Sequence, residues 1–460
     1  MHISIRSVIV ALATVSLVTA AAPLGARAQG PLSLDDAIAR ALKQNPAVRA
    51  AAAGVQEAQA RADQARSGWF PRVDITEGWQ RGDQPVFVFG SLLAQRRFGP
   101  ENFAIDALNY PAPISNFRTA ITAEQLVFDG GRRESAVRQA RLGEQLAATA
   151  GADVGRSLRV AATERYGQVL MAMAQHRAAD AALQSADEDL HRAERRRDAG
   201  LGTEADVLAV RVYQARMRER LISSTSQETI ARALLNDVMG EPLDRVYVLQ
   251  LPRIAAEATP AISQVEADAL ALRADVIQAR LQTSLAREGR ATSRAAFLPQ
   301  VGVQGGLEFN GATFLDQSQS WNVGAFVRWN LFSGLGDAAR LRETTAAQAR
   351  AEADRERVES AVKVELRTAM VRVDDSRARE AVGRTARQQA AESQRIIRDR
   401  YEAGLASVND VLRAAEAVLQ TELQYTTAAV DVIVSAAMPD WAPRRTCSRC
   451  ACIRRGCANV

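Results

Sequence analysis

The sequence predicts an α+β membrane protein made of two repeats, each combining long helices with a pair of β-strands. Three observations predict this class. A short corner of the chain recurs at a fixed offset, two very long stretches are helix-forming throughout, and most aromatic residues gather in short stretches of alternating hydrophobicity.

The internal duplication is visible in two landmarks. The corner "AGLGTEADVL" at 199–208 recurs as "AGLASVNDVL" at 403–412, an offset of 204 residues. Phe128 in "LVFDGGRR" recurs at the same offset as Phe332 in "NLFSGLGD". Because separate landmarks share one spacing, we interpret the chain as two copies of one unit.

The first copy has the longer loop between its strands. Pro71 and Pro299 are equivalent at an offset of 228, so 228 − 204 = 24 additional residues lie between the strands of the first copy. We place this loop at roughly 80–116, against roughly 311–320 in the second copy.

The N-terminal residues 1–28 read as a secretory signal peptide. Arg6 supplies a positive charge, residues 7–22 are apolar or small, and "ARA" at 26–28 fits a cleavage site before Gln29. A membrane anchor is the competing interpretation, but the apolar run is short for a spanning helix of about 20 residues.

The first repeat is expected at 29–240, a linker at 241–260 and the second repeat at 261–437. The tail at 438–460 differs from the Ala-rich text before it and holds all the cysteines of the chain, in a spacing that resembles a zinc or cluster site. The tail lacks His and Glu, so we favour an atypical, disordered tail over a metal site. The cysteines are Cys447, Cys450, Cys452 and Cys457.

Long helices are predicted at 131–198 and 337–403, where Ala, Arg, Glu and Gln dominate and Pro is absent. At 1.5 Å per residue each would be about 100 Å long, which requires partner helices along its whole course. Each ends at a repeated corner and continues in a helical hairpin. Shorter helices are expected at about 33–67 and 263–296, ahead of the strands.

Strands are predicted at 70–79 and 117–128 in the first repeat and at 298–309 and 321–332 in the second. The last strand shows the alternation most clearly, with one wholly apolar face. That face consists of Trp321, Val323, Ala325, Val327, Trp329 and Leu331. A soluble, half-buried sheet would show the same period, so alternation alone leaves both alternatives open.

The placement of aromatic residues favours a membrane. Of the 23 Phe, Tyr and Trp residues, 17 fall within 69–128 and 297–332. Trp321 and Trp329 are eight residues apart, about 26 Å along a strand, which approaches the apolar band of a membrane barrel. We therefore expect Trp79, Trp321 and Trp329 to form a membrane-facing aromatic girdle. Four strands cannot close a barrel, so two or three copies of the chain are required.

From about residue 32 to about 437 the chain resembles the TolC-like outer membrane efflux protein family. The resemblance rests on Asn45-Pro46 at the entry to the first helix, on "LVFDGG" and "NLFSG" after the second strand of each repeat, on the loop text at 86–103 and on the two corners. It implies a homotrimer with one twelve-stranded transmembrane barrel in the cell outer membrane, continuous with a helical coiled-coil barrel in the periplasm. The implied function is a passive exit duct of a tripartite efflux or type I secretion system.

The resemblance also implies partners and site residues. The partners are outer membrane lipid, an inner-membrane transporter and a periplasmic adaptor, or membrane fusion protein. The adaptor is expected to contact the hairpin tips at Gly200, Leu201, Gly404 and Leu405.

A periplasmic gate just after each corner is implied at Asp206, Tyr401 and Asp410. Family members carry a second acidic position one turn on, where this chain has Arg413. The alternative is structural, because "TEAD" and "SVND" fit a capping box in which the acid lies in the first helical turn.

The sequence gives no sign of an enzyme, and we expect no catalytic residue, cofactor or metal site. A glycine pattern in "NLFSGLGDAARL" mimics a dinucleotide fingerprint, but the helix that follows is twice too long for that fold. The net charge of +5 is scattered, so nucleic acid is not an expected partner. The rival function is a periplasmic helical scaffold or adaptor without channel activity.

Overall fold

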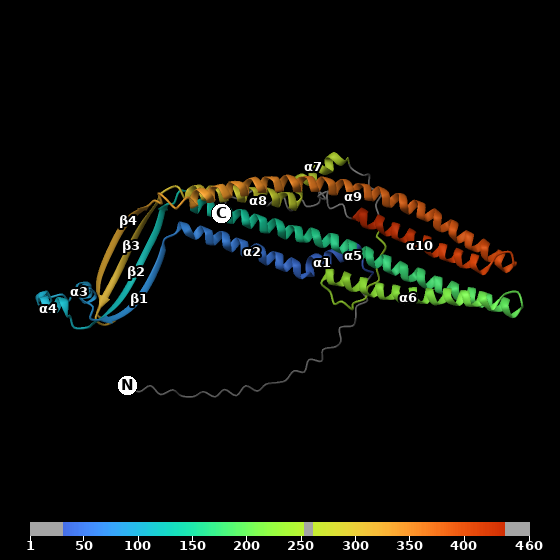
Figure 1. Ribbon diagram of the computed structural model, residues 1–460, viewed down its shortest axis with the longest axis horizontal. Coiled ribbons are helices and arrows are strands. Elements are labelled where there is room, and N and C mark those ends of the chain that lie inside the picture. The colour runs from blue at the N-terminus through green and yellow to red at the C-terminus, as the bar shows by residue number, and fades with distance from the viewer. Residues whose placement is uncertain (1–30, 253–260, 438–460) are drawn as a thin grey trace, which may run out of the picture.

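The computed structural model describes residues 31–252 and 261–437. The expected signal peptide, part of the expected linker and the Cys-containing tail lie outside these ranges. Figure 1 shows an elongated molecule with a β-sheet at one end and two helical hairpin tips at the other. Within the described ranges, every helix is too short or too polar to qualify as a membrane-spanning helix.

The sheet has four antiparallel strands in the order β1-β2-β3-β4. They are β1 (Arg72–Gly82), β2 (Ile114–Phe128), β3 (Gln300–Gly311) and β4 (Ser318–Arg328). The prediction of four strands is confirmed, with ends displaced by a few residues. β4 stops at Arg328, before the predicted end at 332, and in the turn that follows the Ser333 hydroxyl donates to the Asp337 carboxylate at 2.6 Å.

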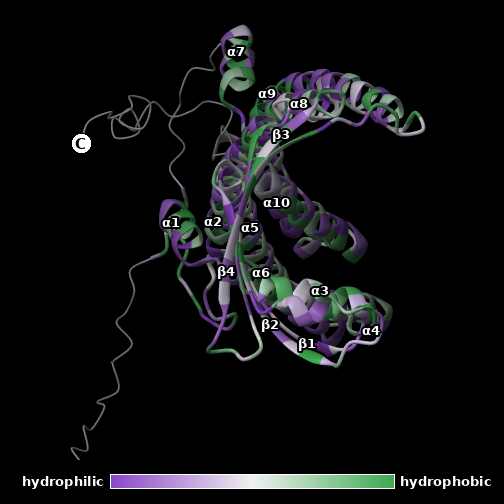
Figure 2. Ribbon diagram, turned by 90° about the vertical axis from the view of Figure 1, so that its left-hand side faces the viewer, coloured by the Kyte–Doolittle hydropathy of each residue, from purple (hydrophilic) through white to green (hydrophobic). Residues whose placement is uncertain are grey.

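The two faces of the sheet differ in polarity. Ile75, Ile121, Leu307 and Trp321 lie side by side across the four strands on one face. On the other face Arg118 donates two hydrogen bonds to Glu308, at 2.9 and 3.1 Å. The loop helix α3 (Pro85–Ala94) is joined to the polar face through the hydrogen bond of Gln95 to Asn116, and Figure 2 shows α3 inside the curve of the sheet, so the apolar face is convex.

Two helices of 67 residues each run the length of the helical part, α5 (Arg132–Asp198) and α9 (Gly336–Glu402). Each turns back into a shorter helix, α6 (Glu204–Met239) and α10 (Val408–Ala437). α5 lies at the centre and packs against α2, α6, α8 and α10. The predicted hairpins are thus present.

The shorter helices are each broken in two, so the single helices predicted at 33–67 and 263–296 are wrong. Asn45 lies between α1 (Leu34–Gln44) and α2 (Pro46–Arg66) with an extended ψ of 130°, because a following proline disfavours the helical conformation. Asn45-Pro46 therefore opens the second helix and not the first. Arg273, at the equivalent position 45 + 228, likewise separates α7 (Ile262–Leu272) from α8 (Ala274–Ala295), with ψ 135°.

The long first loop folds into short helices that the sequence did not predict. They are α3 (Pro85–Ala94), the 3₁₀ turn η2 (Pro100–Phe103) and α4 (Ile105–Asn109). A further 3₁₀ turn, η1 (Ser67–Trp69), joins α2 to the first strand.

The largest fully buried side chain, Tyr166 on α5, organises a core midway along the helices. Its hydroxyl lies 2.8 Å from the carbonyl oxygen of Leu32 and 2.6 Å from that of Gln250. Burial raises the pKa of Tyr166 to about 12, so the hydroxyl stays protonated and donates. This contact joins the start of the first repeat to the segment that leaves it.

Replacing Tyr166 with Phe is expected to destabilise the protein by about 1–2 kcal/mol, because the buried hydroxyl donor shared by the Leu32 and Gln250 carbonyl oxygens is lost. Among the described residues, only the Leu32 oxygen keeps a second donor, the Gln250 amide at 3.0 Å. The measurement is the thermal unfolding midpoint of detergent-extracted protein. Tyr110→Phe is the control, since Tyr110 is 85% exposed and should leave the midpoint unchanged. An equal midpoint for both variants would contradict this assignment.

Candidate functional site

The two hairpin tips have the same backbone geometry. Gly200 and Gly404 adopt left-handed φ values of 74° and 76°, which favour glycine. The amides of the next residues, Leu201 and Leu405, bond back to carbonyl groups five residues earlier, both at 2.8 Å. This closes each long helix with a Schellman motif and reverses the chain within a few residues.

The predicted tip residues form an exposed apolar surface. Leu201 is 68% exposed and Leu405 is 69% exposed, at equivalent positions of the two hairpins. Exposing an apolar leucine side chain to water is unfavourable, so paired exposed leucines at the end of a long helical hairpin suit a contact with another protein. The adaptor contact itself stays a prediction.

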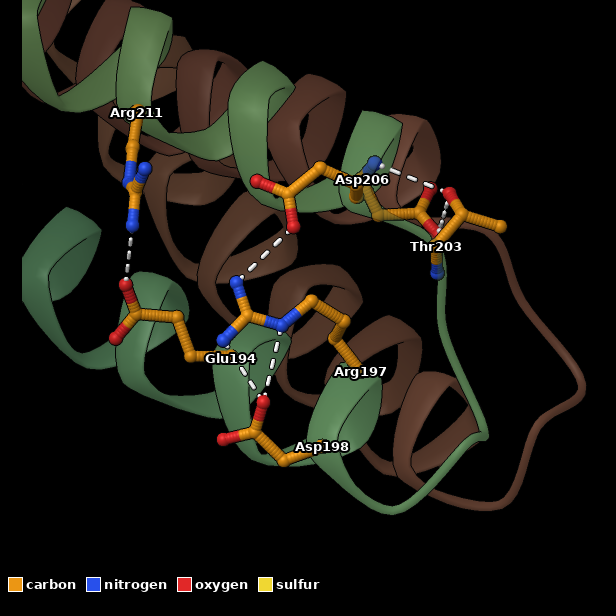
Figure 3. Close-up of polar contacts among 7 residues, drawn as sticks. Glu194, Arg197, Asp198, Thr203, Asp206 and Arg211 are labelled. Carbon is orange, nitrogen blue, oxygen red and sulfur yellow. Dashed lines mark hydrogen bonds and ion pairs between the residues drawn. The ribbon is translucent and has the colours of Figure 1, made fainter.

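Asp206 and Asp410 lie in capping boxes. Thr203 and Asp206 exchange hydrogen bonds at the start of α6 (Figure 3), with the Asp206 carboxylate 3.0 Å from the Thr203 amide. Ser407 and Asp410 repeat this arrangement at 3.0 Å. Hydrogen bonds from Ser407 lower the pKa of the Asp410 carboxyl, so this cap weakens only as the pH falls through that lowered pKa. The capping interpretation is confirmed, while a gate role stays a prediction.

Tyr401, the third predicted gate residue, is only 8% exposed and packs in an apolar cluster between the two hairpins. The cluster includes Val207 from the first hairpin and Val411 from the second. Burial raises the pKa of Tyr401. Within one chain, the tyrosine therefore joins the hairpins, whereas each aspartate is hydrogen-bonded to its own helix start.

Arg196 joins the two tips and was missed from the sequence. Its guanidinium lies 4.7 Å from the centre of the Tyr401 ring, and it donates to the carbonyl oxygens of Glu402 and Leu201 at 3.0 and 3.3 Å. The offset of 204 aligns Arg196 with Arg400, so the two copies carry the same residue here and the repeat gave no signal for this role.

A second link lies about two helical turns further from the tips along α5. Asp189 on α5 is only 5% exposed and accepts from Arg398 of α9 at 3.1 Å. Arg192 reaches the other oxygen of the same carboxylate at 3.1 Å. A buried carboxylate shared by two guanidinium groups is costly to separate from them. Arg192 also reaches the Glu402 carboxylate of the second hairpin at 3.5 Å.

The ion pairs drawn in Figure 3, by contrast, lie within the first hairpin. Arg197 bonds Asp198 at 2.8 Å and the Glu204 carboxylate at 3.0 Å. Arg211 on α6 reaches Glu194 on α5 at 2.9 Å. These contacts stiffen one hairpin and leave the other untouched.

At the opposite end of the molecule, the predicted girdle residues Trp79, Trp321 and Trp329 are 62%, 74% and 57% exposed. Trp329 lies where the strands meet the helices and donates to the carbonyl oxygen of Phe297 at 3.1 Å. Trp69, which was not among the predicted girdle residues, is another tryptophan at this end of the strands. The Arg133 guanidinium lies over its ring, 4.2 Å from the ring centre. The contact with lipid stays a prediction.

Over the described ranges, 31–252 and 261–437, no group of three or more His, Cys, Asp or Glu side chains could hold a metal ion. One shallow surface depression is lined by residues from Gln388 to Ile397 of α9, and another lies between α2, α5 and α8. The surfaces that stand out are therefore the tips, the girdle and the apolar face of the sheet.

A curved sheet with an apolar convex face, continuous with helical hairpins about 100 Å long, defines the class of outer membrane efflux channels. The model of the family "Outer membrane efflux protein" matches residues 37–241 and 266–437. The chain belongs to this family.

Individual relatives agree with that membership. The chain is 26% identical over 318 residues to the pyoverdine export outer membrane protein OpmQ of Pseudomonas aeruginosa, covering 69% of this chain and 64% of the relative. The match thus spans just under two thirds of that relative's length.

Two solved structures show the same fold. A membrane protein from Pseudomonas aeruginosa has a TM-score of 0.75 at 19% identity, covering 88% of this chain and 93% of the other. The CmeC outer membrane channel of Campylobacter jejuni has a TM-score of 0.73 at 17% identity, covering 88% and 85%.

Arg196→Ala is expected to loosen the second tip, because the link from the first hairpin to Tyr401 and Glu402 is lost. Amide exchange at 403–407 should accelerate by roughly tenfold, the factor for about 1.4 kcal/mol. Hydrogen exchange with mass spectrometry measures this directly.

The matched control is Arg197→Ala, which removes a neighbouring charge but only contacts inside the first hairpin. It should accelerate exchange at 199–206 and leave 403–407 unchanged. Equal effects of the two variants on the second tip would refute the bridging role of Arg196.

Proposed function

We propose that this chain is the outer membrane exit duct of a tripartite efflux or secretion system. Three copies form one passive channel in the outer membrane, and their helices extend into the periplasm. The channel carries out no catalytic step, and its substrates arrive from an inner-membrane transporter through a periplasmic adaptor.

The observation that carries this proposal is the incomplete sheet. Among the described strands, β1 pairs only with β2, and β4 pairs only with β3. The convex face is apolar, and an open edge is not tolerated in lipid because its amide and carbonyl groups have no partners. Strands of further copies are needed at both edges.

Three copies give 3 × 4 = 12 strands, well inside the range of about 8 to 26 found in bacterial barrels. Two copies would reach only the lower limit of about eight, which leaves an interior filled by side chains and not a duct. The resemblance to TolC-like proteins supports the trimer. The polar, concave face of the sheet then lines the pore.

We further propose that the two repeats are 29–240 and 261–437, joined by a linker at 241–260. The separate family matches at 37–241 and 266–437 support this division. Because the repeats have equal long helices, both tips reach the same level. That level is where Gly200, Leu201, Gly404 and Leu405 would meet the adaptor.

The gate proposal concerns Asp410, which three copies would repeat around the periplasmic end. A ring of carboxylates at a narrow neck favours cations. Arg413 lies 4.0 Å from the Asp410 carboxylate and offsets part of that charge. We therefore propose a weakly cation-selective neck.

Detergent-extracted protein in a planar bilayer should give long-lived conductance steps. Asp410→Ala is expected to lower the preference for cations on the order of twofold, because three carboxylates leave the neck. Asp198→Ala is the matched control, since it removes an exposed carboxylate of the first hairpin that is not among the predicted gate residues.

If the cation preference of the conductance steps responds equally to both substitutions, Asp410 acts only as a helix cap, and the proposal of an exit duct still stands. A folded trimer that never conducts, even after Arg196→Ala, would favour the scaffold or adaptor function instead.

Arg413→Ala is expected to act in the opposite direction and to strengthen the preference for cations. Arg413 is the positively charged residue on α10 within one turn of Asp410, and its removal leaves the negative charge of Asp410 less compensated. Reversal potentials in a salt gradient measure the preference. An unchanged potential would place the narrowest point of the pore away from this turn.

A further inference from the structure

The loop helix α3 lies at the outer end of the sheet, and Gln95, which follows it, is attached to the polar, concave face by a buried row of amides. The Gln95 side chain, 4% exposed, donates to the Ser115 carbonyl oxygen and to the Asn116 side chain, both at 2.9 Å. Asn116 in turn donates to Asn310, which is 2% exposed, also at 2.9 Å. Buried amides with satisfied partners fix α3 to β2 and β3.

The same loop reaches the far edge of the sheet. The Ser318 hydroxyl donates to the Gln95 carbonyl oxygen at 2.9 Å, and Arg96 donates to the Gln319 carbonyl oxygen at 2.9 Å. Arg96 adopts a left-handed φ of 55°, a conformation that costs free energy in a residue other than glycine. A loop that leaves β1 is therefore held to β2, β3 and β4.

The loop is also packed within itself. Phe98 contacts Phe89 of α3 and Phe103 of η2, with ring centres 4.8 and 5.0 Å apart in edge-to-face geometry. The unit formed by α3, η2 and α4 is thus held in place at the outer end of the sheet. Figure 1 shows it beyond the strand ends, on the side away from the helices.

The surface of α3 that faces away from the sheet is apolar. Val88, Ser91 and Gln95 are turned toward the sheet and buried. On the opposite side, Val86 is 87% exposed and Leu93 is 50% exposed, with Gly90 between them. No atom lies within 4 Å of the position where a Cβ of Gly90 would be. Glycine weakens a helix interior, and at an exposed position it permits close approach by another backbone.

Lipid cannot cover this surface, because it lies on the concave side of the sheet, as Figure 2 shows. When further copies close the sheet into a ring, as proposed above, the concave side faces the pore axis. Around a three-fold axis the same segment of each copy lies at the same level, so the α3 segments of the three copies face one another there. Other exposed apolar side chains at this end are Phe103 and Ile105 of the same loop and Leu315 of the β3–β4 loop.

We propose that the exposed side of α3, formed by Val86, Gly90 and Leu93, is a contact surface for the same segment of the neighbouring copies. The three segments meet on the axis and narrow the outer mouth of the duct. The inference rests on the proposed trimeric duct and adds to it a second constriction, at the end opposite the tips.

Disulfide formation tests the contact. In a background with Cys447, Cys450, Cys452 and Cys457 changed to Ser, Val86→Cys or Leu93→Cys is introduced into the full chain. Copper(II) phenanthroline takes two electrons from a pair of thiols, two protons are released and the disulfide forms. Leu315→Cys is the matched control, since Leu315 is 95% exposed in the β3–β4 loop at the same end.

Linked chains are expected to form about tenfold faster at position 86 or 93 than at 315, because facing side chains in one assembly have a high effective concentration. Linking no faster than at Leu315, in a preparation that is trimeric and conducts, would overturn the contact and leave the proposed function standing. A preparation without trimer would overturn both.

Conductance provides a second readout that does not depend on thiol geometry. Leu93→Asp places three carboxylates on the axis and should raise the conductance about twofold by separating the segments. Leu315→Asp should leave it unchanged. Equal conductance of wild type and Leu93→Asp would overturn the constriction.

Discussion

The structure depends on one constraint: backbone amide and carbonyl groups in contact with hydrocarbon must be paired. β1 and β4 meet this requirement on only one side within a chain, so the fold is complete only as an assembly. The helices share this incompleteness. Val364, Val371 and Val382 on α9 are 62%, 67% and 70% exposed, at spacings of 7 and 11 residues that keep one helix face. Exposed valines at such spacing are what a neighbouring helix would cover.

Continuity between sheet and helices is set at the strand ends. Gly130 and Gly131 have φ values of 70° and 86°, and a Cβ on Gly130 would lie 2.8 Å from Leu298. Buried Asp129 accepts the amide of Arg133 at 2.8 Å, and the Arg133 guanidinium returns to the Leu126 carbonyl oxygen at 2.6 Å. β2 therefore passes into α5 through a fixed turn, and Figure 2 shows the helices following the curvature of the sheet.

The sequence predicted what repeats and what alternates. The offset of 204 relates the first residues of α5 and α9, and both are 67 residues long. The breaks at Asn45 and Arg273 were missed because helix-forming composition on both sides masks a single extended residue, although Pro46 gave a local signal. The helices of the long loop were missed for another reason. Their position depends on Gln95 meeting Asn116 and Asn310, contacts between residues far apart in the chain.

The contacts at the duplicated tips are of two kinds: some stay within one hairpin, and others join the two hairpins. Each capping box lies within its own hairpin, so neither is disturbed when the hairpins separate. By contrast, the contacts of Arg196 with Tyr401 and of Arg398 with Asp189 cross between hairpins and must break. The exposed cation–π contact costs about 1 kcal/mol to break, and the partly buried ion pair costs more. Separating the two hairpins would therefore require breaking the buried contact of Asp189 with Arg398, about three helical turns from Gly200, as well as the apolar packing of Tyr401 with Val207 and Val411.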